Sequence, residues 1–169
     1  YTYDGTAKTP IPTVKDVTTL LVKDTDYTVS YQHNINVGTS TEKPTVIITG
    51  QGNYTGTKSV NFTINPRTLN VKPKDNQSKI YGEADPTFTY EYSNQVSGQT
   101  PGFNGGLTTN ATNTSDAGSY DITQGTLSLK DNGLFKANNY TISYTKASLT
   151  ITKRALNVVA DAKSKTYGD

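Results

Sequence analysis

The sequence predicts an all-β protein made of small immunoglobulin-like β-sandwich modules arranged end to end. Three observations support this prediction: the composition favours strands, short alternating segments lie between turn residues, and two phrases recur at one spacing. The 169 residues include 12 Tyr but no Cys, Met or Trp, and 32% of them are hydrophobic. Tyr, Thr and Val suit half-buried strands, whereas Asn, Gly and Pro favour turns. Such a composition is lean for one large core but adequate for small sandwiches.

Internal repetition divides the chain. The phrase RTLNV at 67–71, followed by SKIYG at 78–82, returns as RALNV at 154–158 and SKTYG at 164–168. Another phrase precedes it each time, beginning with NYT at 53–55 and again at 139–141. The period of 87 residues, from Arg67 to Arg154, exceeds the roughly 20–50 residues of solenoid repeats and suits an independent sandwich module.

The repeat sets the expected domain boundaries. We expect a first module over residues 1–66 and a second over residues 67–153. Residues 154–169 are expected to form either the first strand of a third module or an edge strand of the second. The opening YTYDGTAKTP resembles a looser form of IYGEADP at 80–86, so the chain is interpreted as a slice of a tandem array. Pro66 is expected to end a strand and stiffen the junction between two modules that share no contacts.

Alternating segments predict the strands. They lie between Gly, Asn and Pro residues, and none has the sustained 3.6-residue period of a helix, so antiparallel sheets are expected. In the first module they are DYTVSY at 26–31, TVIITG at 45–50 and SVNFTI at 59–64; in the second they are LNV at 69–71, TFTYEY at 87–92, GSYDITQGTLSL at 118–129, NYTISY at 139–144 and SLTIT at 148–152. Alternation places Val60, Phe62 and Ile64 on one buried face, and Leu149 with Ile151 on another.

The segment TSDAGSYDI at 114–122 predicts a structural corner. Asp116, Gly118 and Tyr120 have the D-x-G-x-Y spacing of the E–F corner in immunoglobulin-like sandwiches, where the Tyr hydroxyl bonds to nearby backbone. Ile122 stands where an antibody domain has a cysteine. We therefore interpret Tyr120 as a structural residue in preference to a carboxylate–tyrosine site.

The sequence contains no motif that indicates a catalytic site. The single histidine, His33, lies in a loop without a recognisable Ser–His–Asp set. Three acidic pairs are too sparse to indicate glycosidase chemistry, and they are Asp24 with Asp26, Glu83 with Asp85, and Asp116 with Asp121. PGFNGG at 101–106 lacks the strand and helix of a phosphate loop and is interpreted as a mobile loop. We expect no enzyme and no catalytic residues.

Cofactors and other ligand classes are similarly unsupported. The absence of cysteine removes disulfides and thiolate metal sites, although it is compatible with export from Gram-positive bacteria. A loop tip could bind Ca²⁺ through oxygen ligands, but DNG at 131–133 lacks the acidic loop pattern and first indicates a tight turn. A Lys–Asn isopeptide cross-link would need a buried Lys, Asn and acid in contact. A net charge of +2 without basic clusters, and no apolar run of about 18 residues, predict neither nucleic-acid binding nor membrane insertion.

Tyrosines are the remaining candidates for ligand contact. Tyr presents a rigid apolar ring with a polar tip, which binding surfaces favour. Phe88, Tyr90 and Tyr92 share one strand face by the period of two, so part of that face is expected to be core. No ligand-binding residue is assigned.

The second module resembles the YG-type MBG repeat of large cell-wall-anchored adhesins from lactic acid bacteria. The resemblance rests on LNV, SKIYG, Asp85-Pro86, DAGSY and NYTI ending in LTI. The first module, with YDGTAKTP, DYTVSY, NINVG and GQGNYTGT, is similar to a companion repeat of bacterial surface proteins. The resemblance implies immunoglobulin-like or β-grasp-like modules, extracellular display on the cell surface, and adhesion to mucin or other host glycoproteins, without catalytic residues.

Two functions are compatible with this resemblance. The modules bind mucus glycans as an adhesin, or they form a stalk that holds another domain away from the cell wall. Tandem repetition suits both, because weak sites gain avidity and rigid modules gain reach.

Overall fold

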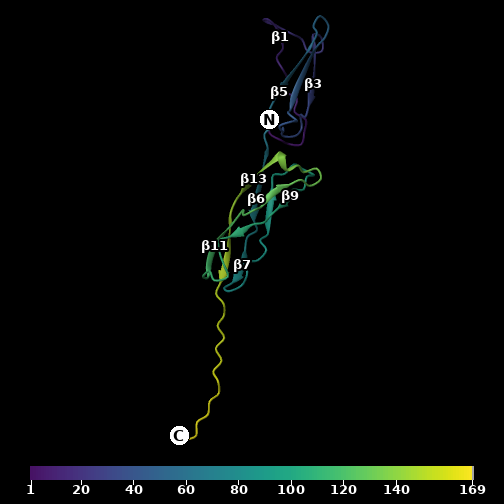
Figure 1. The fold of residues 1–169 in the computed structure, drawn as a ribbon. Coiled ribbons are helices and arrows are strands. Elements are labelled where there is room, and N and C mark those ends of the chain that lie inside the picture. Colours follow the sequence, from purple (N-terminus) through teal and green to yellow (C-terminus); the bar gives the residue numbers. More distant parts are fainter. Residues whose placement is uncertain (169) are drawn as a thin grey trace.

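The computed structural model describes residues 1–168, and within them it contains strands, turns and one 3₁₀ turn, η1 (Ala137–Asn139). The predicted all-β class is therefore confirmed. The strands form an elongated molecule (Figure 1). Strands β1 to β5 occupy one end, β6 to β14 occupy the middle, and residues 153–168 run on as a tail. We call residues 1–66 the N-terminal part and residues 67–153 the C-terminal part.

The N-terminal part has one antiparallel sheet and one small hairpin. The sheet has the order β3 (Tyr27–Gln32), β4 (Thr45–Gly50), β5 (Thr57–Asn61), and the hairpin pairs β1 (Lys15–Asp16) with β2 (Thr19–Leu20). Tyr27 and Val46 are buried in it. The expected buried face over Val60, Phe62 and Ile64 is wrong at its start, because Val60 is 48% exposed and only Ile64 is buried. The strand itself ends at Asn61, as an edge strand with every residue exposed.

The C-terminal part contains three sheets. Their orders are β13–β6–β8, β10–β11–β14–β7 and β12–β9. The strands are β6 (Arg67–Pro73), β7 (Gln77–Ile80), β8 (Tyr90–Ser93), β9 (Gly102–Asn104), β10 (Thr108–Thr109), β11 (Gly118–Thr123), β12 (Ser128–Lys130), β13 (Tyr140–Tyr144) and β14 (Ala147–Thr152). The segment expected as one strand over 118–129 is therefore two, β11 and β12, which belong to different sheets.

Two of the strand pairs are parallel, which corrects the antiparallel expectation. Strand β13 runs parallel to β6, with Tyr140 opposite Arg67, and β14 runs parallel to β7, with Thr152 opposite Ile80. The first segment, 67–80, and the last segment, 140–152, thus lie side by side and cross together from one sheet to another. Sequence alternation defines their faces but not their partners, so the pairing direction could not be read from it.

The core of the C-terminal part follows the period of two. On β6 the inward residues Leu69 and Val71 are at most 1% exposed. On β14 the inward residues Leu149 and Ile151 are at most 2% exposed, as the sequence predicts. Phe135, from the turn before η1, is fully buried in the same cluster.

The predicted tyrosine corner is present. The Tyr120 hydroxyl donates a 3.0 Å hydrogen bond to the backbone carbonyl of Asp116. Ile122, which stands where an antibody domain has a cysteine, is fully buried. The Tyr144 hydroxyl donates to the Ile122 carbonyl at 3.0 Å, so a second tyrosine fixes the same strand.

Replacing Tyr120 with phenylalanine should lower the free energy of unfolding by about 1 kcal/mol, because one hydroxyl hydrogen bond is lost while the ring keeps its packing. Calorimetry would measure this as a lower melting temperature. Tyr167→Phe is the control, since Tyr167 lies fully exposed in the tail. Equal melting temperatures for the two variants would contradict the structural role of Tyr120.

Residues 153–166 form no strand, and their side chains are exposed. Leu156 is 87% exposed and Val158 is 81% exposed, whereas Leu69 and Val71, their counterparts in the repeat, are buried. Within residues 1–168 no helix has the length and hydrophobicity needed to cross a membrane.

Candidate functional site

The acidic pairs noted in the sequence support local structure. Asp26 accepts a 2.8 Å hydrogen bond from the Val22 N–H, and Asp24 forms an ion pair with Lys23 at 3.3 Å. Asp121 pairs with Lys146 at 2.6 Å on the surface. Asp116 contributes its backbone carbonyl to the tyrosine corner.

His33 lies exposed in a turn of the N-terminal part, with a positive φ of 51°. This placement agrees with its interpretation as a solvated loop residue.

The DNG segment at 131–133 forms a turn stabilised by its own aspartate. Asp131 accepts a 2.8 Å hydrogen bond from the Ala137 N–H, which lowers the pKa of its carboxyl. Asn132 and Phe135 exchange two backbone hydrogen bonds across the turn, and Gly133 has a φ of 55°. In residues 1–168 no group of three or more His, Asp or Glu residues is placed to hold a metal ion.

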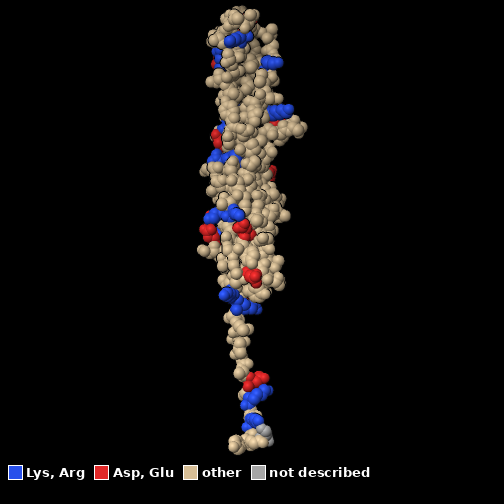
Figure 2. All heavy atoms as spheres, turned by 90° about the vertical axis from the view of Figure 1, so that its left-hand side faces the viewer, with Lys and Arg blue, Asp and Glu red and all other residues tan. Residues whose placement is uncertain are grey.

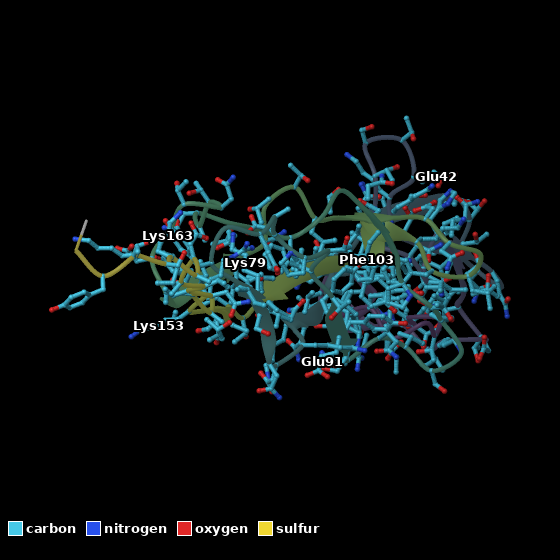
Figure 3. The ribbon with its side chains drawn as sticks, turned by 90° about the horizontal axis from the view of Figure 1, so that it is seen from below. Glu42, Lys79, Glu91, Phe103, Lys153 and Lys163 are labelled. Atoms are coloured by element: carbon cyan, nitrogen blue, oxygen red, sulfur yellow. The ribbon has the colours of Figure 1, made fainter. Side chains whose placement is uncertain are left out.

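Lys79 is a buried charge that sequence reasoning did not single out. Its side chain is 2% exposed, and it continues the inward-facing positions of the first segment. Its Nζ donates to Asp85 Oδ1 at 2.6 Å and to the Thr112 carbonyl at 2.8 Å. Figure 3 shows Lys79 among neighbouring side chains, whereas Glu91 lies at the edge of the molecule. The acceptors of Lys79 are a carboxylate and a carbonyl, so this contact lacks the asparagine of a Lys–Asn cross-link.

A similar pair occurs in the N-terminal part. Lys8 is 8% exposed and its Nζ contacts Asp4 Oδ1. The same carboxylate accepts hydrogen bonds from the N–H and hydroxyl of Thr6. The Lys8 contact is the main cause that holds the pKa of Asp4 well below its usual range. Each part of the chain thus has one buried lysine neutralised by an aspartate.

The interpretation of PGFNGG as a mobile loop is wrong for part of the segment. Gly102–Asn104 form β9, which pairs with β12. Phe103 packs on the rings of Tyr90 and Tyr92, with centroids 5.1 and 5.7 Å away. The face shared by Phe88, Tyr90 and Tyr92 therefore becomes more exposed along the chain: Phe88, which precedes β8, and Tyr90 are half-buried, and Tyr92 is 37% exposed.

A polar face covers the outside of the sheet β13–β6–β8. Because Leu69 and Val71 point inward, Thr68, Asn70 and Lys72 point outward. The register places Ser93 beside Asn70 and Glu91 beside Lys72. This face contains a shallow hollow of ≈ 440 Å³, lined by Asn70, Val71, Lys72, Glu91, Tyr92, Ser93 and Thr145. The outward residues of this lining combine hydroxyl, amide and charged groups, a mixture suited to hydrogen-bonding a polar ligand such as a sugar, whereas Tyr92 lies opposite Val71 on the inward side of the sheet.

Charged side chains on the surface are otherwise scattered. On the face shown in Figure 2 they form small groups, several of which mix both signs. That distribution differs from the continuous basic stripe that marks nucleic-acid interfaces.

A cluster of polar and aromatic side chains joins the N-terminal part to the C-terminal part. The expectation that the two parts share no contacts is therefore wrong. Asn139, which is 1% exposed, accepts a 2.8 Å hydrogen bond from the Val37 N–H and donates one of 2.8 Å to Asn36 Oδ1. Tyr3 lies in the same hydrophobic cluster as the core of the C-terminal part. Its ring meets that of Tyr140 edge to face, with centroids 5.4 Å apart.

Gln99 completes this cluster. It donates from Nε2 to the Tyr3 hydroxyl at 2.8 Å, and its Oε1 accepts from the Tyr140 hydroxyl at 2.7 Å. Burial raises the pKa of Tyr140, which keeps this hydroxyl protonated and able to donate. We call Tyr3, Asn36, Gln99, Asn139 and Tyr140 the joint cluster.

The sequence contained partial signals for the residues that were missed. Lys79 recurs as Lys165, and Asn139-Tyr140 recurs as Asn53-Tyr54. Both recurrences are part of the repeat, but no neighbouring residue in the sequence indicates that these polar side chains are buried.

The comparisons with known proteins agree with the repeat. No curated protein and no solved structure is matched by the chain. Residues 69–150 match the family model described as MBG domain (YGX type). The matched range begins in β6 and ends in β14, so it covers the two parallel segments and the sheets between them. Residues 69–150 of this chain are therefore an MBG domain of the YGX type.

Proposed function

We propose that the chain is part of an extracellular adhesin of a Gram-positive bacterium and that it binds mucin or other host glycoproteins without catalysis. The family match over residues 69–150 carries this proposal, because MBG domains are a non-catalytic, adhesin-type family. The polar face on β13–β6–β8 supports it, because glycans are bound through hydrogen-bonding side chains of the kind that line this face. Binding is proposed to need neither a metal nor another cofactor.

The architecture that we propose for this function is a tandem array. Residues 1–66 and 67–153 would be two successive β-sandwich modules, with a further module beginning in 154–169. The tyrosine corner supports an immunoglobulin-like character for the second module. Its two parallel strand pairs favour the β-grasp-like alternative at the same time. In such an array, weak glycan sites on successive modules would act together through avidity.

The proposed glycan contact can be tested with the full chain on immobilised purified mucin. We expect measurable binding by surface plasmon resonance, and weaker binding when the mucin glycans have been oxidised or removed. The paired variant Asn70→Ala with Ser93→Ala should reduce affinity about 30-fold, since it removes two hydrogen bonds that are each worth about 1 kcal/mol.

The control is the paired variant Ser119→Ala with Thr150→Ala, which removes two exposed hydroxyls from neighbouring positions on the other large sheet. It should bind mucin as the unchanged chain does. Equal loss in both paired variants would argue against the polar face, and binding that survives glycan removal would argue against glycan recognition.

The second candidate function is that of a stalk. The joint cluster favours it, because hydrogen bonds and ring contacts between the two parts would hold successive modules in line. A chain that binds no mucin but keeps its two parts in a fixed orientation in solution would support the stalk over the adhesin.

A further inference from the structure

Tyr3 and Tyr81 occupy equivalent places in the two parts of the chain. The Tyr3 N–H donates to the Asn65 carbonyl at 2.9 Å, and the Tyr81 N–H donates to the Thr152 carbonyl at 2.9 Å. Asn65 and Thr152 each lie two residues before the arginine that marks the repeat. A left-handed glycine follows each tyrosine closely, Gly5 with a φ of 82° and Gly82 with a φ of 87°.

The surroundings of the two tyrosines differ. Tyr3 is 3% exposed, because Tyr140 of the C-terminal part packs against its ring and Gln99 donates to its hydroxyl. Tyr81 is 41% exposed, and so is Ile80 beside it. The same structural position is thus covered at one end of the C-terminal part and open at the other.

The group that covers Tyr3 also has an open counterpart. Asn139 and Tyr140 correspond in the repeat to Asn53 and Tyr54. Asn139 is buried against Asn36 and Val37, whereas Asn53 is exposed. Each part therefore has one tyrosine of the first kind, Tyr3 or Tyr81, and one Asn-Tyr pair. At the internal junction Tyr3 of the N-terminal part meets the Asn-Tyr pair of the C-terminal part, whereas Tyr81 and the pair at Asn53 have no such contact with each other.

The repeated arginines contact different groups in the covered and open cases. At the internal junction, where Tyr3 is covered, Arg67 donates from Nε to the Asn94 carbonyl at 2.6 Å. Asn94 belongs to the C-terminal part, which is the part that covers Tyr3. Arg154 donates from Nε to the Tyr81 carbonyl at 2.9 Å. A docked module that supplied the equivalent of Asn94 would give Arg154 the contact that Arg67 already has.

We propose that Tyr81 and Ile80 form a docking surface for a further MBG-type module that presents a Gln99-like amide and a Tyr140-like ring. Its occupant is a second copy of the C-terminal part, beginning at the position of Arg154. Two observations support this occupant: the phrase of residues 67–82 resumes at Arg154, and the internal junction is a template for the contacts. The proposal concerns contact between modules and does not depend on mucin binding.

The test extends the chain by one repeat. In the extended protein, residues 1–153 are joined directly to a second copy of residues 67–169. The second copy of Arg67 then stands at the position that Arg154 has in the natural sequence. The sequence has no cysteine, so Lys130→Cys in both copies of the C-terminal part places two spin labels without background. Lys130 is exposed on β12. Double electron–electron resonance then reports the distribution of distances across the new junction.

We expect one narrow distance peak, like that across the internal junction of the 169-residue chain labelled through Lys58→Cys and Lys130→Cys. Tyr81→Ala in the first copy should broaden the peak, and Tyr81→Phe should broaden it less because the ring remains. Leu134→Ala in the first copy is the control, since Leu134 is 76% exposed on a turn next to Phe135, at the other end of that part. It should leave the peak narrow.

Tyr81→Ala in the 169-residue chain should leave the melting temperature nearly unchanged, which separates docking from folding. A broad distribution in the unmutated extended chain, or a peak that stays narrow in Tyr81→Ala, would overturn the proposal.

Discussion

Replacing Asp85 with asparagine is expected to lower the free energy of unfolding by about 3 kcal/mol, because it leaves the Lys79 ammonium buried without its carboxylate. Removing one partner of a buried ion pair typically costs about 3–5 kcal/mol. We expect the lower end of this range because the Asp85 side chain is 35% exposed, although the Lys79 side chain is only 2% exposed. Urea denaturation followed by circular dichroism measures the change directly.

Asp121→Asn is the matched control for this prediction. It removes a carboxylate at the same 2.6 Å distance from a lysine, but both side chains of that pair are at least half exposed, so the cost should be about 1 kcal/mol or less. Combining Lys79→Met with Asp85→Leu should recover part of the stability lost in Asp85→Asn, because no buried charge remains. Equal effects of Asp85→Asn and Asp121→Asn would show that burial of Lys79 does not matter.

Replacing Asn139 with alanine should cost about 2 kcal/mol and uncouple the two parts of the chain. The change removes both hydrogen bonds of a buried amide and leaves the Val37 N–H without its acceptor. The N-terminal part has few buried side chains of its own, so it should then unfold before the C-terminal part. Hydrogen exchange at the Val37 amide should accelerate by about tenfold for each 1.4 kcal/mol lost.

Asn53→Ala is the control for Asn139→Ala. It tests whether the loss of stability depends on the buried position of Asn139 or only on replacing an asparagine. Asn53 corresponds to Asn139 in the repeat but is exposed, so its replacement should change stability by no more than about 0.5 kcal/mol. A single cooperative transition in Asn139→Ala, at the melting temperature of the unchanged chain, would contradict a stabilising role for the joint cluster.

Local pattern predicted the features that depend on neighbours in sequence. The burial of Leu149 and Ile151 follows from a period of two, and the hydrogen bond of Tyr120 spans only the residues back to Asp116. The family resemblance also rested on short phrases, and residues 69–150 match that family.

Features that depend on distant residues could not be predicted in the same way. Strand β13 could have lain beside any strand, and nothing near Tyr140 specifies Arg67 as its parallel neighbour. The polar side chains of Lys79 and Asn139 suggest exposure by type, whereas their burial depends on Asp85, Thr112 and the loop at Asn36. Conversely, Val60 fits a buried strand by type but lies on an edge strand.

The parallel course of the first and last segments determines how the C-terminal part would respond to tension. The chain enters at Arg67 and leaves at Thr152, and these residues begin and end two neighbouring segments that run in the same direction. Pulling these two residues apart therefore slides one segment along the other, so the ladder hydrogen bonds share the load and must break together. In an antiparallel hairpin pulled from its two ends, the same bonds would open one after another. This geometry resists extension without any covalent cross-link, as the proposed role at a cell surface would require.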